Sequence, residues 1–120
     1  MNRKKPFLNY RIRTPQLAEI PEILSLFADE VSAGRMLPRS KKNMQGSLDN
    51  WQVAYTNDEI IGCVSLVIFN QTLCEIRSLA VAENYRKNGL GKRLIEAALA
   101  RAQERGVKNV LTLTRVPELF

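Results

Sequence analysis

The stretch Arg86–Lys92 constrains this chain more than any other, because it joins a strand-like run to a helix-like run. The first run is Cys74–Val81, and the second, Leu90–Arg105, repeats apolar residues at helical spacing. Gly89 and Gly91 let the backbone turn tightly and come close to a ligand. The first amides of a helix lack partners within it and attract anions. We therefore expect this loop to bind a ligand that carries phosphates.

The loop does not match two other phosphate motifs. A P-loop needs Gly and Ser or Thr where Arg86 and Arg93 stand, so no nucleoside triphosphate is indicated. A dinucleotide fingerprint needs Gly or Ala where Leu94 stands. A plain turn at Asn88-Gly89 before a solvated helix start stays an alternative. The expected contacts come from Arg86, Lys87, Asn88, Gly89, Leu90, Gly91 and Lys92.

The composition predicts a single domain over residues 1–120, with residues 1–9 as a flexible basic lead-in. The apolar content of 45% is enough for a real core. The net charge of +6 suits an anionic small ligand and would also suit nucleic acid. Aromatic residues are not clustered, so binding to nucleic acid is disfavoured.

The chain contains no histidine, which removes Ser-His and Cys-His nucleophile pairs. With only two cysteines, an ordinary structural zinc site is also excluded, and we expect no metal. Acid–base chemistry must then use carboxylates, Tyr, Cys or water.

The two cysteines are predicted to be buried thiols. A hairpin turn at Asn70-Gln71 would place Cys74 opposite Val67. The same register places Cys63 opposite Ser78, so the thiols do not meet, as expected in a reducing cytoplasm. No run approaches the roughly 20 apolar residues of a membrane helix, and the first ten residues lack the apolar centre of a signal peptide. We therefore expect a soluble cytoplasmic protein without membrane contact.

Periodicity and turn residues predict an alternation of strands and helices. Pro21 is tolerable only in the first turn of a helix, Ser40 can cap the next one, and Asn57-Asp58 suits a two-residue hairpin. Strands are expected over Tyr10–Arg13, Trp51–Thr56, Glu59–Phe69, Thr72–Val81 and Asn109–Thr114. Helices are expected over Ile20–Glu30, Lys41–Leu48 and Leu90–Arg105. The last helix should bury Leu90, Leu94, Ile95, Ala98, Leu99 and Ala102.

The loop and its surroundings resemble one family. Arg or Gln, two residues, Gly, one residue, and then Gly or Ala, at the start of a helix after a strand, resembles the acetyl-CoA pyrophosphate loop of the GNAT acetyltransferases. The runs Glu75–Val81, Glu83–Arg86 and Leu111–Thr114 resemble the amino-acid-acetylating branch typified by N-acetylglutamate synthase. Leu37–Ser40 resembles a substrate-side segment of that branch. The resemblance covers Tyr10–Phe120.

This resemblance implies the α/β (α+β) GNAT fold. Its mixed central sheet holds an antiparallel meander of the second, third and fourth strands, and flanking helices cover the sheet. The fourth and fifth strands should splay apart in a V shape. The family normally adds a helix and two strands, so the C-terminal helix and last strands are expected to be missing after Phe120. Either the chain is truncated, or another chain covers the edge in a homo-oligomer, most simply a dimer.

The resemblance also implies acetyl-CoA as co-substrate, lying in the notch between the splayed strands. The backbone of Leu79, Ala80 and Val81 would pair with its pantetheine. A bulge near Ser78–Ala80 would free those groups and could direct an amide at the thioester oxygen.

Glu75 stands at the catalytic carboxylate position of the family. By resemblance it is the general base, directly or through water, that takes a proton from the acceptor's ammonium group. The alternative is a structural ion pair with Arg77, which shares its strand face two residues later.

Arg39, Arg77 and Arg115 are candidates to bind the carboxylates of an amino-acid acceptor, because guanidinium groups match carboxylates with two bonds. Each could instead be an ordinary surface arginine. Residues 115–120 contain neither the Tyr nor the Ser that family members use to protonate the leaving thiolate.

The predicted function is transfer of an acetyl group from acetyl-CoA to the amino group of a small amino acid. L-Glutamate, as in arginine biosynthesis, is the leading acceptor, and attack is direct within a ternary complex. One alternative is another amine acceptor, such as a polyamine, a drug or a protein. Another is a non-catalytic or incomplete acyl-CoA-binding module.

Overall fold

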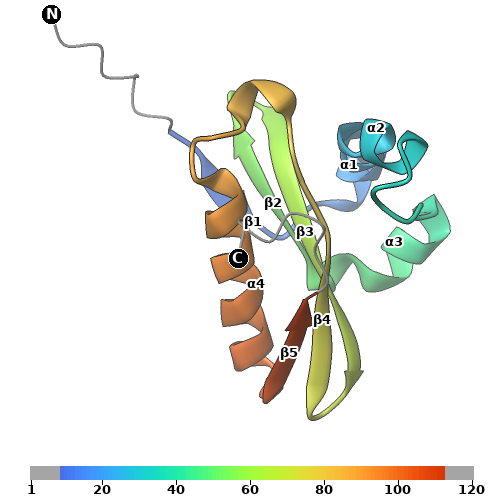
Figure 1. Cartoon of the computed structure of the whole chain (residues 1–120), viewed down its shortest axis with the longest axis vertical. Coiled ribbons are helices and arrows are strands. Elements are labelled where there is room, and N and C mark those ends of the chain that lie inside the picture. The colour runs from blue at the N-terminus through green and yellow to red at the C-terminus, as the bar shows by residue number, and fades with distance from the viewer. Residues whose placement is uncertain (1–8, 113–120) are drawn as a thin grey trace, which may run out of the picture.

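The computed structural model describes residues 9–112 of the chain. Its centre is a five-stranded sheet in the order β1-β2-β3-β4-β5 (Figure 1). The first four strands pair antiparallel, and β5 joins β4 in parallel. This confirms the predicted mixed sheet and its central meander. The strands are β1 Arg11–Arg13, β2 Trp51–Thr56, β3 Glu59–Asn70, β4 Leu73–Val81 and β5 Asn109–Thr112.

Turn chemistry sets both hairpins of the meander. The β2–β3 turn uses Asn57 and Asp58 with φ of 50° and 62°, the left-handed geometry that matches the twist of a hairpin. The β3–β4 turn lies at Gln71 and Thr72, one residue later than predicted. There the side-chain oxygen of Asn70 accepts the backbone N–H of Thr72 at 2.8 Å. This Asx turn is why the hairpin closes later.

The later turn also changes the register between β3 and β4. Cys74 pairs with Ile68 rather than with Val67, so the predicted register is wrong by one residue. Cys63 pairs with Ala80, two residues from the predicted Ser78, because an extra β4 residue between the pairs Ser65–Arg77 and Cys63–Ala80 adds a further shift. Both cysteines are nevertheless buried and free, as predicted.

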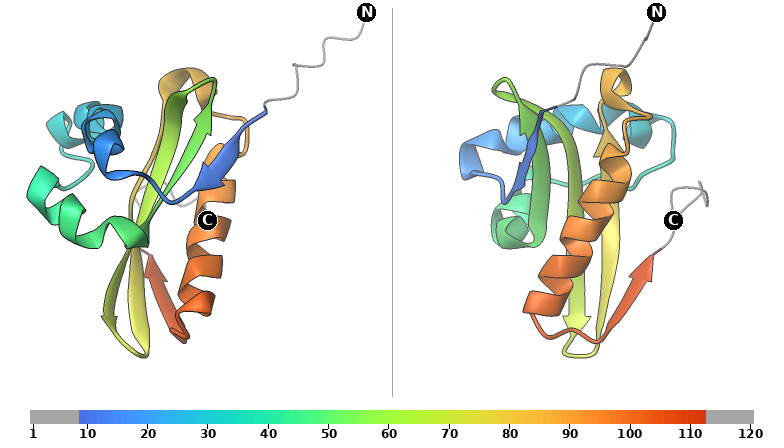
Figure 2. Two further views of the ribbon diagram at one scale, coloured as in Figure 1. Left: turned by 180° about the vertical axis from the view of Figure 1, so that it is seen from behind. Right: turned by 90° about the vertical axis from the view of Figure 1, so that its left-hand side faces the viewer.

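Helices cover both faces of the sheet (Figure 2). Helix α4, Leu90–Glu104, packs on one face, while α1, Ile20–Leu26, and α3, Lys41–Ser47, lie on the other. The α4 core contains Ala54, Ile61, Val64, Leu66, Cys74, Ile76, Leu90, Leu94, Ile95, Ala98, Ala102 and Val107. The α1 and α3 core contains Ile20, Ile23, Phe27, Met44, Trp51, Val53, Ile60, Cys63 and Ala80. Single 3-10 turns lie at Leu17–Glu19, Leu48–Asn50 and Glu83–Tyr85.

Leu99 does not belong to the buried stripe of α4. Its side chain is 43% exposed, so that part of the prediction is wrong. Leu99 lies one helical turn after Ile95 and about 40° further round the helix, beyond the edge of the arc that faces the sheet.

The helix predicted over Ile20–Glu30 is broken at Phe27, and a second helix, α2, follows at Ala28–Ser32. Pro21 lies in the first turn of α1, as predicted. Phe27 leaves helical geometry and stacks its buried ring on Trp51 with the ring centroids 6.2 Å apart. Within residues 9–112, no helix is long and apolar enough to cross a membrane.

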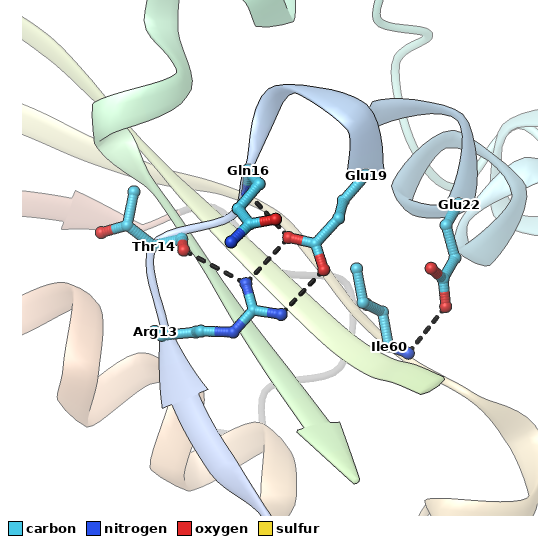
Figure 3. A network of polar contacts seen from close by, with 6 residues as sticks. All are labelled: Arg13, Thr14, Gln16, Glu19, Glu22 and Ile60. Atoms are coloured by element: carbon cyan, nitrogen blue, oxygen red, sulfur yellow. Dashed lines mark hydrogen bonds and ion pairs between the residues drawn. The ribbon is translucent and has the colours of Figure 1, made fainter. Parts of the chain in front are cut away.

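Two carboxylates tie the first helical segment to the sheet (Figure 3). Arg13 on β1 donates hydrogen bonds of 2.8 and 2.7 Å to Glu19. These bonds lower the pKa of the Glu19 carboxyl, because the guanidinium favours its charged form. Glu22 of α1 accepts the backbone N–H of Ile60 on β3 at 2.8 Å. The helical layer is therefore anchored to the sheet at two points.

Candidate active site

The loop between β4 and α4 has the geometry of an anion-binding turn. The chain enters α4 at Gly89, which has a left-handed φ of 75°. Among the described residues, no side chain caps this start of the helix. The backbone amides of Leu90, Gly91 and Lys92 have no hydrogen-bond acceptor among the described residues. These N–H groups and the helix dipole make the start of α4 attractive to an anion.

A strained residue shapes this loop. Lys87 has a φ of 68°, which costs a residue with a side chain about 1 kcal/mol. The Asn88 side-chain amide donates to the carbonyl oxygens of Tyr85 and Arg86 at 3.1 and 3.3 Å. The loop is therefore a held conformation rather than a simple turn at Asn88-Gly89.

Arg86 is positioned by both the sheet and the helical layer. Its Nε donates to the carbonyl oxygen of Val81 at 3.1 Å, and one of its Nη atoms lies 3.5 Å from Glu30 of α2. The pKa of Glu30 is lowered, first by hydrogen bonds from Arg35 and also by the charges of both arginines. Glu30 therefore stays ionised and holds Arg86 at the loop.

The edge of β4 from Arg77 to Val81 that faces away from β3 has no described strand beside it, and this stretch is here called the opening. All the described residues of β5 pair with β4, and the last described pair is Ile76–Thr112. Ala82 donates its N–H to Ile61 on β3 at 2.8 Å. The alternation of an antiparallel ladder then directs the backbone groups of Val81 and Leu79 toward the opening. The predicted splay would begin beyond Thr112, outside the described residues.

A β-bulge lies in β4 beside this opening. The ladder steps from the pair Ser65–Arg77 to the pair Cys63–Ala80, so β4 holds one residue more than β3. Ser78 lies in the bulge with a left-handed φ of 56°. The predicted bulge is confirmed, and it bends the strand where the resemblance places the reacting thioester.

Cys74 and Ile76 of β4 belong to the α4 core, and side chains alternate between the two faces along a strand. Glu75 and Arg77 therefore lie on the opposite face of the sheet, which α1 and α3 partly cover. Glu75 is 5% exposed, and its Oε1 accepts a hydrogen bond of 2.7 Å from the Nε of Arg77. The guanidinium of Arg77 also lies 5.7 Å from the ring centroid of Phe69. The ion pair named as the alternative for Glu75 is thus present, and it also places a buried carboxylate beside the opening.

Arg39 reaches the same region from the segment before α3. Its Nε donates to Asn43 at 3.1 Å, one Nη donates to Ser78 at 3.4 Å, and its guanidinium lies 5.2 Å from the Trp51 ring centroid. Burial and the charge of Arg77 lower the pKa of Arg39. No carboxylate of residues 9–112 lies within ion-pair distance of it. The guanidinium of Arg39 is therefore fixed in position by Asn43 and Ser78 and keeps N–H groups that can bind an anion.

The structure thus brings Arg39, Glu75 and Arg77 to one end of the opening and the loop of residues 86–92 to the other. Arg115 lies outside the described residues. Sequence reasoning missed Asn43, although the Ser40 cap, whose Oγ accepts the Asn43 N–H at 3.0 Å, marks it as one turn into α3. Between residues 9 and 112, no cluster of His, Cys, Asp and Glu could hold a metal ion.

The fold and the arrangement of this candidate site are those expected of the GNAT family, and comparison with known proteins agrees. The sequence profile of the acetyltransferase (GNAT) family matches residues 18–119, so the chain belongs to this family. An uncharacterized N-acetyltransferase of Chlorobaculum tepidum is 36% identical over 103 residues. The match covers 86% of this chain and 66% of that protein.

A more distant relative is the amino-acid acetyltransferase of Pasteurella multocida, 26% identical over 86% of this chain and 24% of that protein. Among solved structures, N-acetylglutamate synthase from Neisseria gonorrhoeae with coenzyme A and N-acetyl-glutamate matches with a TM-score of 0.85 at 24% identity. That match covers 96% of this chain and 27% of the synthase chain, and it supports the fold. The chain therefore spans only part of the length of these relatives.

Proposed function

We propose that this protein is an acetyl-CoA-dependent N-acetyltransferase that acetylates the amino group of a small amino acid, with L-glutamate as the leading acceptor. One observation carries the proposal. A loop with unpaired helix-start amides and a pair of arginines beside a buried carboxylate lie at opposite ends of the opening along β4.

The loop suits the phosphates of coenzyme A. The amides of Leu90, Gly91 and Lys92 would bind the pyrophosphate, with Arg86 and Lys87 adding charge. Asn88 and Gly89 set the path of the loop. The backbone of Leu79, Ala80 and Val81 would pair with the pantetheine, because part of its hydrogen-bonding edge faces the opening. Solved relatives of this fold with bound coenzyme A support the assignment.

At the other end, Arg39 and Arg77 would bind acceptor carboxylates, with Arg115 as a further candidate. Glu75 would take the proton that the acceptor's ammonium group must lose before its nitrogen attacks the thioester carbon. Holding amine and thioester side by side supplies much of the rate, because correct placement alone is worth about 7–11 kcal/mol. The likeness to amino-acid acetyltransferases supports an amino-acid acceptor.

The proposal extends to a single cytoplasmic domain that takes part in arginine biosynthesis and assembles as a homodimer. The buried free thiols of Cys63 and Cys74 support a reducing compartment. The half-exposed Leu111 on the edge strand β5 supports a covered edge. Light scattering of the purified chain measures the dimer directly.

The test is incubation of the purified chain with acetyl-CoA and a panel of amino acids and polyamines. Thiol release is followed, and calorimetry measures binding of coenzyme A in parallel. We expect release that depends on L-glutamate. Release with only another amine would correct the acceptor, and binding without release would leave a non-catalytic module. Absence of binding would refute the assignment of the loop.

A further inference from the structure

We propose that Cys63 and Ser65 of β3 are positioning residues, which hold the β4 bulge in the conformation that the active site requires. Both point polar groups into an otherwise apolar interior. Ser65 is 1% exposed, and its hydroxyl donates to the carbonyl oxygen of Arg77 at 3.1 Å. The fully buried thiol of Cys63 donates to the carbonyl oxygen of Ser78, with Sγ and oxygen 3.3 Å apart.

The bulge explains why side chains are needed here. Between the pairs Ser65–Arg77 and Cys63–Ala80, the single residue Val64 faces two residues of β4. The β3 backbone therefore cannot pair with every carbonyl of the bulged strand. A buried carbonyl without a partner is costly, and the hydroxyl and the thiol supply the partners.

The chemistry of Cys63 fits this role. Burial raises the pKa of its thiol to about 12, so the sulfur keeps its proton at neutral pH and stays a donor. The left-handed φ of Ser78 is a conformation that relaxes unless its surroundings hold it. Two side-chain bonds at adjacent carbonyls provide such a hold.

The bulge lies between the two ends of the opening, so its conformation affects both. The hydroxyl of Ser78 accepts a bond from Arg39 on the acceptor side. The next residue, Leu79, directs its backbone toward the opening on the cofactor side. If the bulge relaxes, both contacts lose their geometry, although neither Cys63 nor Ser65 reaches a ligand.

The test removes the polar donor at each position and, at Cys63, compares this loss with a substitution that keeps a donor. Ser65→Ala and Cys63→Ala remove the donor, whereas Cys63→Ser keeps one. Thr56→Val is the matched control, because the Thr56 hydroxyl also donates from a strand to a carbonyl, that of Asn9 at 2.6 Å, at the far end of β2.

The first measurement is amide hydrogen exchange in the ligand-free proteins. We expect the amides of Ala80 and Ala82, which face β3, to exchange roughly fivefold or more faster in the two alanine variants, as loss of one bond predicts. Cys63→Ser and Thr56→Val should stay close to the wild type. Unchanged exchange at these amides, or an equal increase throughout the sheet, would overturn the proposal.

The second measurement rests on the proposed function. The Kd of coenzyme A and the KM of the amino acid should both rise roughly threefold to tenfold in the alanine variants, with recovery in Cys63→Ser. If the wild type binds coenzyme A and the alanine variants show the same Kd and KM as the wild type, the positioning role is refuted. A wild type that does not bind coenzyme A would refute the proposed function instead, and the exchange experiment would still decide on the bulge.

Discussion

Replacing Arg39 by alanine tests whether its guanidinium binds the acceptor carboxylate. In the free protein the Nε of Arg39 donates a hydrogen bond to Asn43 and one Nη donates to Ser78. The remaining N–H groups are available to bind a carboxylate. The nearby Arg77 adds a second positive charge that disfavours the charged form of Arg39. A carboxylate bound between the two arginines would relieve this repulsion as well as accept hydrogen bonds.

The magnitude follows from the loss of one charged contact. Hydrogen bonds to charged groups contribute roughly 1.5–3 kcal/mol, and each 1.4 kcal/mol changes affinity about tenfold. Arg77 remains to share the carboxylate, and the site is half open to water, so we expect the amino-acid KM to rise roughly 10- to 30-fold. Arg39→Lys keeps the charge but loses the two parallel N–H groups of the guanidinium, and it should raise the amino-acid KM by about threefold to tenfold.

The assay is steady-state thiol release at saturating acetyl-CoA with varied amino acid, and then the reverse. Arg11→Ala is the matched control, since Arg11 is an exposed arginine on β1. Thermal melts of both variants check that Arg39 is not needed for folding. An amino-acid KM equal to that of the wild type, or a change confined to the KM of acetyl-CoA, would refute this role for Arg39.

Three further predictions concern the carboxylates and the core. Glu75→Gln keeps the shape of the buried side chain but cannot accept a proton, so kcat should fall by about 10²–10⁴ while calorimetry shows unchanged binding of coenzyme A; wild-type turnover would remove Glu75 from the mechanism. Gly62→Val should lower the free energy of unfolding by roughly 1–3 kcal/mol in urea titrations. The reason is that a Cβ there would lie only 2.8 Å from a methyl carbon of Leu94. An unchanged urea midpoint would show that the core rearranges around the added side chain without loss of stability. Because Arg13 lowers the pKa of Glu19, the ion pair stabilises the fold above the ordinary Glu pKa, and this contribution is lost as pH falls through the lowered value. Glu19→Gln should therefore cost up to about 1 kcal/mol at neutral pH and progressively less as pH falls through the lowered pKa of Glu19, and an equal loss at neutral and at acidic pH would contradict the linkage.

Much of the fold could be predicted from local patterns. The order of strands and helices, the Asn57-Asp58 turn, the Ser40 cap and the entry of α4 at the glycine-rich loop are all confirmed. Each depends on residues within a few positions of one another, where turn geometry, capping and apolar periodicity act. The loop of residues 86–92, proposed to bind phosphates, could be located before the helix for the same reason.

The failures occurred where particular side-chain contacts decide, one of them local and the others between residues far apart in the chain. The β3–β4 turn moved by one residue because the Asn70 side chain closed an Asx turn. The helix of residues 20–30 broke because Phe27 stacks on Trp51 of β2. Leu99 is exposed because the sheet covers a narrower arc of α4 than the apolar residues span.

The sequence by itself determined the family, the place of the glycine-rich loop before α4 and the expectation of a bulge in β4, since these depend on residue types at short, regular spacing. Only the tertiary structure decided that Arg39 contacts Ser78, 39 residues later in the chain, and that Cys63 and Ser65 supply the donors for the bulge. The physical reason is that these contacts depend on strand register and on how the α3 layer packs on the sheet. Both are set by burial and hydrogen bonding summed over the whole domain.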